Sequence, residues 1–325
     1  MRRLAYLGPP GTFSEAALRR LAEAGGLDVE GVPVATTADA LDAVRDGVCD
    51  GAVVPLENSV EGVVTAVLDE LATGRPVRLV REVVLPVAFR VLVRPGTAAA
   101  DVRVVASHPH ALAQCRRWVR AELPAAVPLA RPSTAEAATA VADGQADAAL
   151  VAPSSGPHAP GAGLETLADG VADDPGAVTR FVLAAPADAP VPEPSGADVT
   201  SLVVRLAEER PGALLDVLTE VAVRGVNVVR LTSRPAGGGL DRYVFHLDAQ
   251  GHVAEERVAD AVAALHRVAG HVRFLGSYPR SGAPAGPRRP GTGDADFTAA
   301  RRWVEALRAG SGDPDGPTPV GASAA

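Results

Sequence analysis

Three neighbouring residues, Thr179, Arg180 and Phe181, carry side chains that could take part in catalysis. Thr179 offers a hydroxyl donor, Arg180 a permanent cation whose planar fork fits a carboxylate, and Phe181 an aromatic face. A Pro-Gly turn precedes them, and the apolar run 181–183 predicts a buried strand. The polar pair is therefore expected where a loop enters a strand, which suits side chains that must be positioned accurately. Solvated residues at a strand edge would give the same pattern.

A second polar group, Glu57-Asn58-Ser59, follows an apolar strand that ends near residue 56. Asn58 could cap a following helix, with Glu61 three positions on, and capping alone explains that spacing. Glu57 is harder to explain structurally, because a carboxylate between a buried strand and a cap has no evident structural role. We therefore treat residues 57–59 as candidate site residues.

A third group begins at Ser107-His108-Pro109-His110 and leads into a helix predicted over 111–121, which carries Gln114 and Cys115. The H-x-H spacing invites a metal site, but the sequence shows no third ligand, so no metal is predicted. Ser107 as helix N-cap is the structural alternative. Further along, Ser133 and Glu136 form an S-x-x-E capping box, with Thr134 beside the cap.

The N-terminal segment predicts a strand over 4–7 and then a helix. Thr12 and Glu15 have the spacing of a capping box, and first-turn amides at such a helix start can bind an anion. The glycine spacing of a dinucleotide site is absent. A P-loop is excluded because all 31 basic residues are arginine, so its lysine is missing.

An internal repeat organises these segments. Residues 37–54 match residues 134–151 without gaps, and both copies spell a capped helix, a glycine after its last turn and a short apolar strand. The shared Asp-Gly-x-x-Asp does not follow from the alanine-rich composition. We predict two similar α/β lobes, with the strands in 83–93 and 102–106 in the second. Polar loops follow both repeat strands, at 55–62 and 153–156, and would face each other across a cleft.

The composition is that of a globular protein, with 47% hydrophobic and 22% charged residues in 325. The net charge of -8 argues against nucleic acid as main partner but not against a small anion. No stretch is long enough to span a membrane, and the first apolar run is too short for a signal peptide. Cys49 and Cys115 are expected to be buried reduced thiols. We expect a cytoplasmic protein.

A proline- and alanine-rich linker over 186–199 precedes a second compact region. Its apolar patterns predict strand, helix, two strands, helix and strand, a ferredoxin-like βαββαβ domain over 200–279. Residues 280–325 are predicted to be disordered by composition, apart from a lone helix that 297–307 could form.

The motifs together resemble the prephenate dehydratase family. They are YLGPPGTFSEAAL (6–18), VVPLENSVEG (53–62), SHPHALAQC (107–115), STAEAA (133–138) and TRF (179–181), in the family's order. The C-terminal region resembles its ACT regulatory domain, with GALL at 212–215 and TSRP at 232–235. The resemblance implies a two-lobed, periplasmic-binding-protein-like catalytic domain over 1–185. Its lobes would cover about 1–76 with 165–185, and 77–164.

The resemblance implies that prephenate loses water and carbon dioxide to give phenylpyruvate, without a cofactor. It implies catalytic roles for Thr179, Arg180, Phe181, Glu57, Asn58 and Ser59, with Thr179 donating to the leaving hydroxyl. Arg180 would bind a carboxylate or, equally, form a salt bridge between the lobes, and Phe181 would line the pocket or be core. Implied substrate-binding residues are Thr12, Ser107, His108, Gln114, Ser133 and Thr134. Allosteric phenylalanine is expected at a dimer interface near Gly212, Ala213, Leu214, Asn227 and Ser233, in a homodimer or homotetramer.

Two positions depart from the family pattern. Ala177 stands where the family has asparagine, and Thr232 where the ACT motif begins with glutamate. Two other functions stay open: arogenate dehydratase, which differs only in the substrate side chain, and a non-catalytic amino-acid sensor built from the same lobes and ACT domain.

Overall fold

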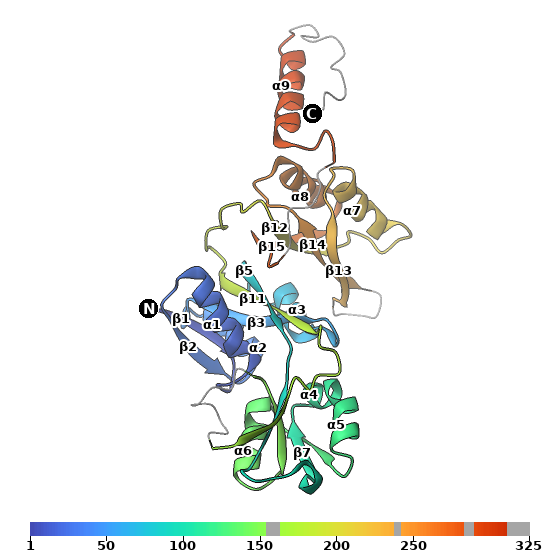
Figure 1. The fold of residues 1–325 in the computed structure, drawn as a ribbon. Coiled ribbons are helices and arrows are strands. Elements are labelled where there is room, and N and C mark those ends of the chain that lie inside the picture. Colours follow the sequence, from blue (N-terminus) through green and yellow to red (C-terminus); the bar gives the residue numbers. More distant parts are fainter. Residues whose placement is uncertain (154–162, 237–241, 283–288, 311–325) are drawn as a thin grey trace, which may run out of the picture. The chain divides into compact units, whose positions relative to one another are not determined.

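The structure is a computed structural model that describes residues 1–153, 163–236, 242–282 and 289–310. The chain forms two compact units, Met1–Pro190 and Val191–Ala325, and each is described by itself. Figure 1 shows their ribbon coloured along the sequence, with most of the elements labelled. Within the described ranges, no helix has the length and apolar character needed to cross a bilayer.

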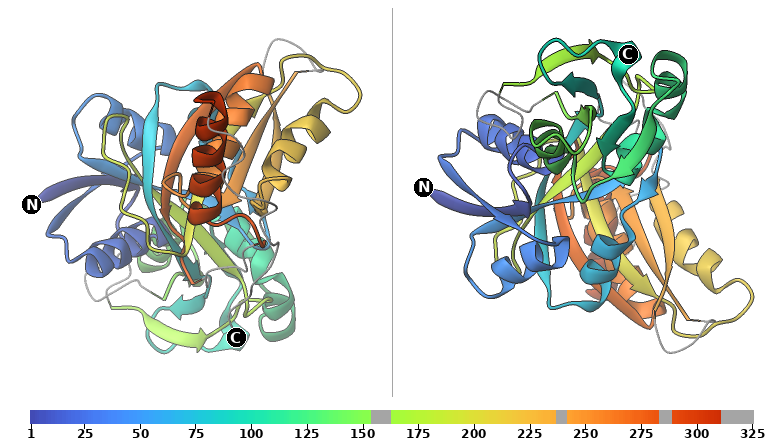
Figure 2. Two further views of the ribbon diagram at one scale, coloured as in Figure 1. Left: turned by 90° about the horizontal axis from the view of Figure 1, so that it is seen from above. Right: turned by 90° about the horizontal axis from the view of Figure 1, so that it is seen from below.

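The first unit contains two sheets, and the first sheet has strand order β2-β1-β3-β11-β5, with the short β4 beside β3. β1, β2 and β3 are parallel, whereas β11 runs antiparallel to β3 and β5. Helices α1 and α2 cover opposite faces of this sheet (Figure 2). The elements are β1 (Arg2–Leu7), α1 (Phe13–Gly25), β2 (Val29–Val34), α2 (Thr37–Arg45), β3 (Gly51–Asn58), β4 (Gly62–Val63), α3 (Thr65–Thr73), β5 (Val77–Pro86) and β11 (Val178–Pro186).

The second sheet has strand order β10-β6-β9-β7-β8 and belongs to the second lobe. Its elements are β6 (Arg90–Val93), η1 (Ala99–Asp101), β7 (Val104–Ser107), α4 (Pro109–Gln114), α5 (Arg116–Glu122), β8 (Val127–Ala130), α6 (Thr134–Ala142), β9 (Ala148–Val151) and β10 (Glu165–Asp169). The single helix predicted over 111–121 is in fact two. Asp173 separates them, because its carboxylate accepts hydrogen bonds from the first free amides of α5, at Arg117 and Trp118.

The predicted limits of the two lobes are wrong at both places where the chain passes from one lobe to the other. β5 pairs with β11 along its length and so belongs to the first sheet, although 77–86 was assigned to the second lobe. β10 pairs with β6 in the second sheet, although 165–169 was assigned to the first lobe. An apolar strand pattern does not specify its partner strand, because pairing is a long-range property. The chain therefore crosses between the lobes after β5 and after β10.

The internal repeat is confirmed, because each copy forms a helix, a glycine turn and a strand. Gly47 and Gly144 follow α2 and α6 with φ of 69° and 74°. The shared aspartates have the same contact: Asp50 Oδ2 accepts from Arg3 N at 2.7 Å, and Asp147 Oδ2 accepts from Val104 N at 3.0 Å. Each carboxylate thus binds a backbone amide at the start of the neighbouring parallel strand. Residues 154–156 of the second predicted loop lie outside the described residues.

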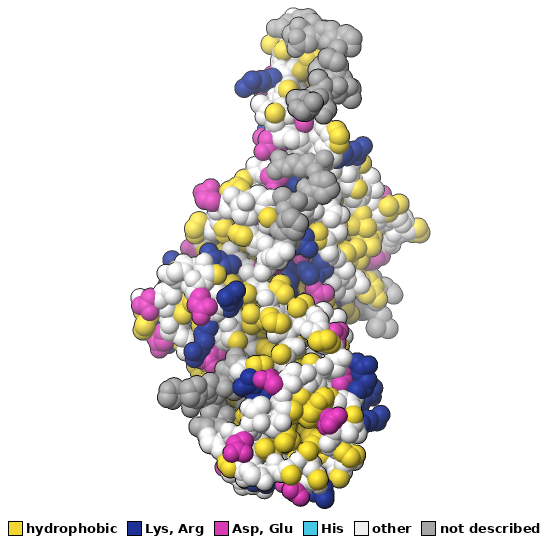
Figure 3. Space-filling model, in the orientation of Figure 1, with side chains coloured by type: hydrophobic (Ala, Val, Ile, Leu, Met, Phe, Trp, Pro, Cys, Tyr) yellow, Lys and Arg dark blue, Asp and Glu magenta, His cyan; other side chains and the backbone are white. Residues whose placement is uncertain are grey.

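Separate apolar cores stabilise the two lobes, and Phe13 touches both. Its ring packs edge-on against Phe89 with centroids 5.7 Å apart, which joins the start of α1 to the second lobe. The cores are built mainly from Val, Leu and Ala, as the low aromatic content requires. Outside them, acidic and arginine side chains are interspersed on the face drawn in Figure 3.

The second unit has the predicted ferredoxin-like βαββαβ fold. Its antiparallel strands lie in the order β13-β14-β12-β15, and the core lies between the sheet and α7 and α8. The elements are β12 (Asp198–Arg205), α7 (Ala213–Ala222), β13 (Val228–Pro235), β14 (Tyr243–Gln250), α8 (Glu256–Val268) and β15 (His271–Pro279).

The lone helix that the sequence allowed over 297–307 is present as α9, which spans Asp294–Arg308 within the range otherwise predicted to be disordered. Asp296 accepts a hydrogen bond from Gly293 N at the helix start, and Arg301 pairs with Glu256 of α8. These local contacts outweigh the glycine- and proline-rich composition around the helix. Residues 283–288 and 311–325 lie outside the described residues.

Candidate active site at the junction of the two lobes

Thr179 and Asn58 lie directly opposite each other on the antiparallel pair β11 and β3. Asn58 Nδ2 donates a hydrogen bond to Thr179 Oγ1 at 2.8 Å. Asn58 Oδ1 accepts from Val60 N at 2.8 Å and Glu61 N at 2.9 Å. Because the carbonyl end of the amide faces two donors, its NH₂ end must face the threonine. Thr179 Oγ1 therefore acts as an acceptor here, and its own proton has no acceptor among the described residues.

The role predicted for Asn58 as a helix cap is wrong. No helix begins at Asn58: the chain turns at Gly62, whose φ is 84°, and returns as β4 beside Glu57 and Asn58, and the next helix, α3, begins only at Thr65. The two amides that Asn58 binds belong to this turn. A side-chain turn and a helix cap share the same sequence signature, since both place backbone donors two and three residues after an asparagine.

The loop after β3 contacts the segment that enters β11 and also the second lobe. Ser59 N donates to Val178 O, and Val178 N donates to Ser59 Oγ, both at 2.9 Å. Gln114, the last residue of α4, donates from Nε2 to Glu61 Oε1 at 3.4 Å. Thr179, Asn58, Ser59 and Gln114, four of the predicted site residues, therefore lie together at the lobe junction.

Arg180 forms a buried ion pair with Glu82 of β5, with Nε 2.5 Å from Oε2. Both side chains are nearly enclosed, at 7% and 4% exposure. The predicted alternative of a salt bridge between the lobes is corrected, because β5 and β11 are neighbours in one sheet. Phe181 is 2% exposed in the core under α1, which agrees with the expectation of core packing. Glu57 is half-buried and lies opposite Arg180 in the β3–β11 register.

Ser107 and His108 differ from the predicted helix start. His108, not Ser107, is the N-cap of α4, and its Nδ1 accepts from His110 N. Ser107 is fully buried and donates from Oγ to Leu150 O at 2.7 Å, which ties β7 to β9. Burial, and then the neighbouring His110, lower the pKa of His108, so its imidazole is neutral at pH 7. Across the described parts of the chain, no group of three His, Cys, Asp or Glu side chains could hold a metal.

Ser133 and Thr12 cap helices as predicted, although each capping box is incomplete. Ser133 Oγ accepts from Glu136 N at 3.0 Å at the start of α6, with Thr134 buried beside it. Thr12 Oγ1 accepts from Glu15 N at 3.5 Å at the start of α1. The Glu15 carboxylate binds Gly11 N instead of returning to the cap. Although burial opposes it, this bond and Arg19 hold the pKa of Glu15 below its usual value.

The two cysteines are buried free thiols, as predicted. Burial, reinforced by the nearby Asp173 carboxylate, raises the pKa of Cys115 to about 12. Cys49 also has a raised pKa, again chiefly because of burial. Neither thiol therefore ionises readily near neutral pH.

The predicted effector residues of the second unit do not lie together within a single copy of the chain. Gly212 and Ala213 begin α7, beyond the carboxyl end of β12, whereas Gln250 N donates to Asn227 O at the other end of the sheet. These ends are separated by the length of β12, about 25 Å. Ala213 lines a cavity of about 340 Å³ with Leu206 and Arg210, and Ser233 is exposed on the edge strand β13.

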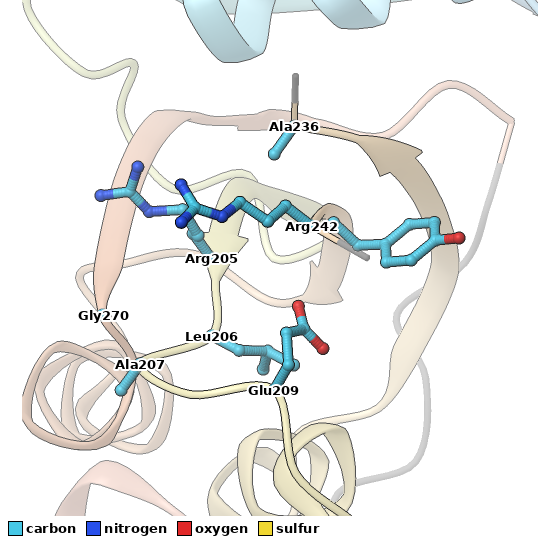
Figure 4. A pocket seen from close by; sticks show the side chains of 8 residues that line it. Arg205, Leu206, Ala207, Glu209, Ala236, Arg242 and Gly270 are labelled. Atoms are coloured by element: carbon cyan, nitrogen blue, oxygen red, sulfur yellow. The ribbon is translucent and has the colours of Figure 1, made fainter. Parts of the chain in front are cut away.

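A larger cavity of about 610 Å³ lies between the loop after β12 and the β13–β14 hairpin. None of the predicted effector residues lines it. Figure 4 shows Arg205 and Arg242 reaching the same part of this cavity, with Glu209 across from them.

Two acidic residues at the junction were missed as site residues. Glu61 was noticed only as the fourth position of a capping box, although it bonds the second lobe. Glu82 gave no signal, because its pairing with Arg180 joins residues 98 positions apart.

Comparison with known proteins identifies the family of the chain. The prephenate dehydratase family model matches residues 4–188, and the ACT domain model matches residues 200–267. A prephenate dehydratase from Amycolatopsis methanolica is 49% identical over 95% of this chain and 99% of its own length. The crystal structure of an Arthrobacter aurescens prephenate dehydratase in complex with L-Phe has a TM-score of 0.88 and 43% identity, covering 94% of this chain and 99% of that one. A structure described as GqqA, a novel type of quorum quenching acylase, has a TM-score of 0.72 and 32% identity, covering 86% and 99%. The chain belongs to the prephenate dehydratase family, in its form with a C-terminal ACT domain.

Proposed function

We propose that the lobe junction around Thr179 converts prephenate to phenylpyruvate, water and carbon dioxide. The observation that carries the proposal is the Asn58–Thr179 hydrogen bond, which leaves the threonine proton available for a ligand. As the ring C–O bond breaks, Thr179 Oγ1 passes its proton to the departing hydroxyl, which leaves as water, and the threonine then regains a proton from solvent. The C–C bond to the ring carboxylate breaks with it, and its electron pair completes the aromatic ring.

The donor from Asn58 makes Thr179 a better acid. An N–H directed at the hydroxyl oxygen stabilises negative charge that develops there when the proton moves toward the leaving group. The bond also fixes the rotamer of Thr179, so that little reorganisation is needed during the reaction. Ring aromatisation supplies the driving force, and hydrogen bonding by one positioned donor suits such a reaction.

We propose that backbone amides at the starts of α1 and α6, beside Thr12 and Ser133, receive the carboxylates of prephenate. Arg180 is less suited to that role than its sequence context indicates. Its guanidinium is already bound to Glu82 inside the sheet, and separating a buried ion pair is costly. We therefore assign Arg180 to holding β11 against β5, which keeps Thr179 in place.

The test is to mix the purified protein with prephenate and follow phenylpyruvate by its absorbance, with arogenate as a parallel substrate. Phenylpyruvate formation from prephenate is expected. Turnover of arogenate alone would assign the chain to the arogenate reaction. Amino-acid binding without either reaction would favour the alternative that the chain is a non-catalytic amino-acid sensor.

The similarity to a quorum quenching acylase raises acyl-amide cleavage as a second activity. Such chemistry uses a nucleophile that is activated by a neighbouring base. Thr179 Oγ1 has no hydrogen bond to a histidine or carboxylate among the described residues, so the geometry favours elimination. Release of a free amine from an N-acyl substrate by the same preparation would contradict this.

We propose that phenylalanine binds the ACT domain, since the Arthrobacter relative has been solved in complex with L-Phe, and that the site requires two copies of the chain. The distance between Gly212 and Asn227 supports a site shared between subunits, and the edge strand β13 is available for pairing. Phenylalanine would then regulate the elimination by feedback. A homodimer or homotetramer and a cytoplasmic location belong to the same proposal.

A further inference from the structure

The side chain of Gln114 is held between the lobes with one end satisfied and the other not. The residue is 8% exposed and ends α4 of the second lobe. Its Nε2 donates to Glu61 Oε1, whereas its Oε1 is buried and has no hydrogen-bond partner among the described residues. A buried carbonyl oxygen without a donor is unfavourable, because it has lost its hydrogen bonds to water. The site therefore offers an acceptor that a ligand can satisfy.

The orientation of this amide follows from the chemistry of Glu61. An ionised carboxylate only accepts hydrogen bonds, so the end of Gln114 that faces it must be the NH₂ group. The carbonyl end is then directed away from Glu61. If residue 61 were a donor, the amide would be more stable after a half-turn, with the NH₂ end where the carbonyl now lies.

Glu61 is also connected to the reacting threonine. Its backbone N–H donates to Asn58 Oδ1 at 2.9 Å, and Asn58 Nδ2 donates to Thr179 Oγ1 at 2.8 Å. One short loop thus fixes the direction of both functional groups. Thr179 presents a donor, and Gln114 presents an acceptor.

We propose that Glu61 is a positioning residue that sets the carbonyl of Gln114 as the acceptor for the ring hydroxyl of the substrate. This inference rests on the proposed function. Prephenate as a dianion has a single hydrogen-bond donor, its ring hydroxyl. That group donates to Gln114 Oε1 while its oxygen accepts from Thr179, so the leaving group is held from both sides.

The test is a double-mutant cycle on the full chain, with Glu61→Ala and Gln114→Ala made singly and together. If Glu61 acts through Gln114, Glu61→Ala lowers kcat/KM about tenfold in the wild-type background. This is the loss expected when one hydrogen bond to the substrate is no longer aligned. In the Gln114→Ala background the same change alters kcat/KM less than about twofold. Equal losses in both backgrounds, or no loss in either, would overturn the proposal.

A second series reports orientation instead of folding. Glu61→Gln can still accept from Gln114 and is expected to retain more activity than Glu61→Ala. Glu61→Lys, which can only donate, should turn the amide and fall below Glu61→Ala. The reverse order would overturn the proposal. Glu122→Ala removes an exposed carboxylate at the end of α5 and is the matched control, expected at wild-type activity.

The two levels of inference fail in different ways. An inactive wild-type protein would refute the elimination itself and with it the role of Glu61. An active wild-type protein whose Glu61 variants all keep normal kcat and KM would refute only the role of Glu61. Melting temperatures of all variants, measured alongside, identify any that lose activity by unfolding.

Discussion

Asn58 and Thr179 are 121 positions apart in the chain, yet Asn58 Nδ2 lies 2.8 Å from Thr179 Oγ1. The antiparallel pairing of β3 with β11 creates this contact, and the turn after β3 fixes its polarity. Thr179 Oγ1 therefore accepts from Asn58, and its own proton is left to donate to a ligand.

Replacing Thr179 tests the proposed donor directly. Thr179→Ala is expected to fold normally and to lose about 10²- to 10⁴-fold in kcat, because the leaving hydroxyl loses its donor. Thr179→Ser keeps the hydroxyl and should retain most of the activity. Phenylpyruvate production and a thermal melt of each variant decide the matter; full activity of Thr179→Ala would remove the residue from the mechanism.

A single substitution separates the two functions of Asn58, which are to accept from the turn amides and to donate to Thr179. Asn58→Asp still accepts from Val60 N and Glu61 N, so the turn should survive, but its carboxylate cannot donate to Thr179. We expect the melting temperature to change little while kcat falls at least tenfold. Asn58→Ala removes both functions and should lower both quantities. An active Asn58→Asp enzyme would show that the donated bond is not needed.

The Arg180–Glu82 pair is expected to act on stability. Glu82→Ala removes one partner of a buried ion pair and should cost about 3–5 kcal/mol in the free energy of unfolding, measured by denaturant titration. Replacing both residues, as Arg180→Met with Glu82→Leu, should recover most of that loss.

Activity of this double variant distinguishes the two roles of Arg180. A stable double variant with near-normal KM would fit a structural role. One that is stable but has a KM for prephenate raised a hundredfold would return Arg180 to substrate binding.

Asp147 gives a pH-dependent prediction. Hydrogen bonds from Arg103 N and Val104 N, aided by Arg94, hold its pKa below the usual value. A carboxyl whose folded pKa is depressed adds stability above its unfolded pKa of about 3.9, and this stability is lost as the pH falls through the folded value. Asp147→Asn should therefore destabilise the chain by about 1–2 kcal/mol at pH 7.

That difference should vanish in strong acid. Chemical denaturation of the wild type and Asp147→Asn at pH 7 and at steps down to about pH 2 checks it. A difference that stays constant over this interval would show that the charge of Asp147 is not involved.

Gly212 allows a test of the proposed effector site. Its φ of 83° places it in the left-handed region at the start of α7, so Gly212→Ala is expected to cost about 1 kcal/mol and to distort the first amides of that helix. Calorimetric titration should show weaker phenylalanine binding. Gly26→Ala, with φ of 58° after α1, is the control for strain alone and should leave the affinity unchanged. Equal effects of both changes would argue against a site at Gly212.

Local patterns predicted the helices and strands that local contacts stabilise. The repeated helix, glycine and strand at 37–54 and 134–151 could be predicted because every step is encoded within about 18 residues. The βαββαβ order of the second unit could be predicted for the same reason. What failed depends on partners that are distant in the sequence: the sheet to which β5 belongs, and the carboxylate of Glu82 beside Arg180.

The residue types of the candidate site could be predicted from the sequence, but the hydrogen bonds between these residues could not. Thr179, Asn58, Ser59 and Gln114 do lie together. Asn58, however, binds the amides of a turn and not those of a helix that it could have capped, and Ser107 is fully buried and donates a hydrogen bond to the neighbouring strand. Turn and cap signatures coincide over three or four residues, so sequence alone does not separate them.

The pairing of β5 with β11 has one more consequence. Pro86 lies opposite Val178, so the second lobe leaves and re-enters the first sheet at two adjacent points. That lobe is therefore an insertion between the two strands of an antiparallel pair, at the end where a hairpin turn would otherwise lie. Joining Pro86 to Val178 through a two-residue turn should yield a shorter polypeptide that keeps the first sheet and the Asn58–Thr179 contact, yet has nothing left to close over a substrate.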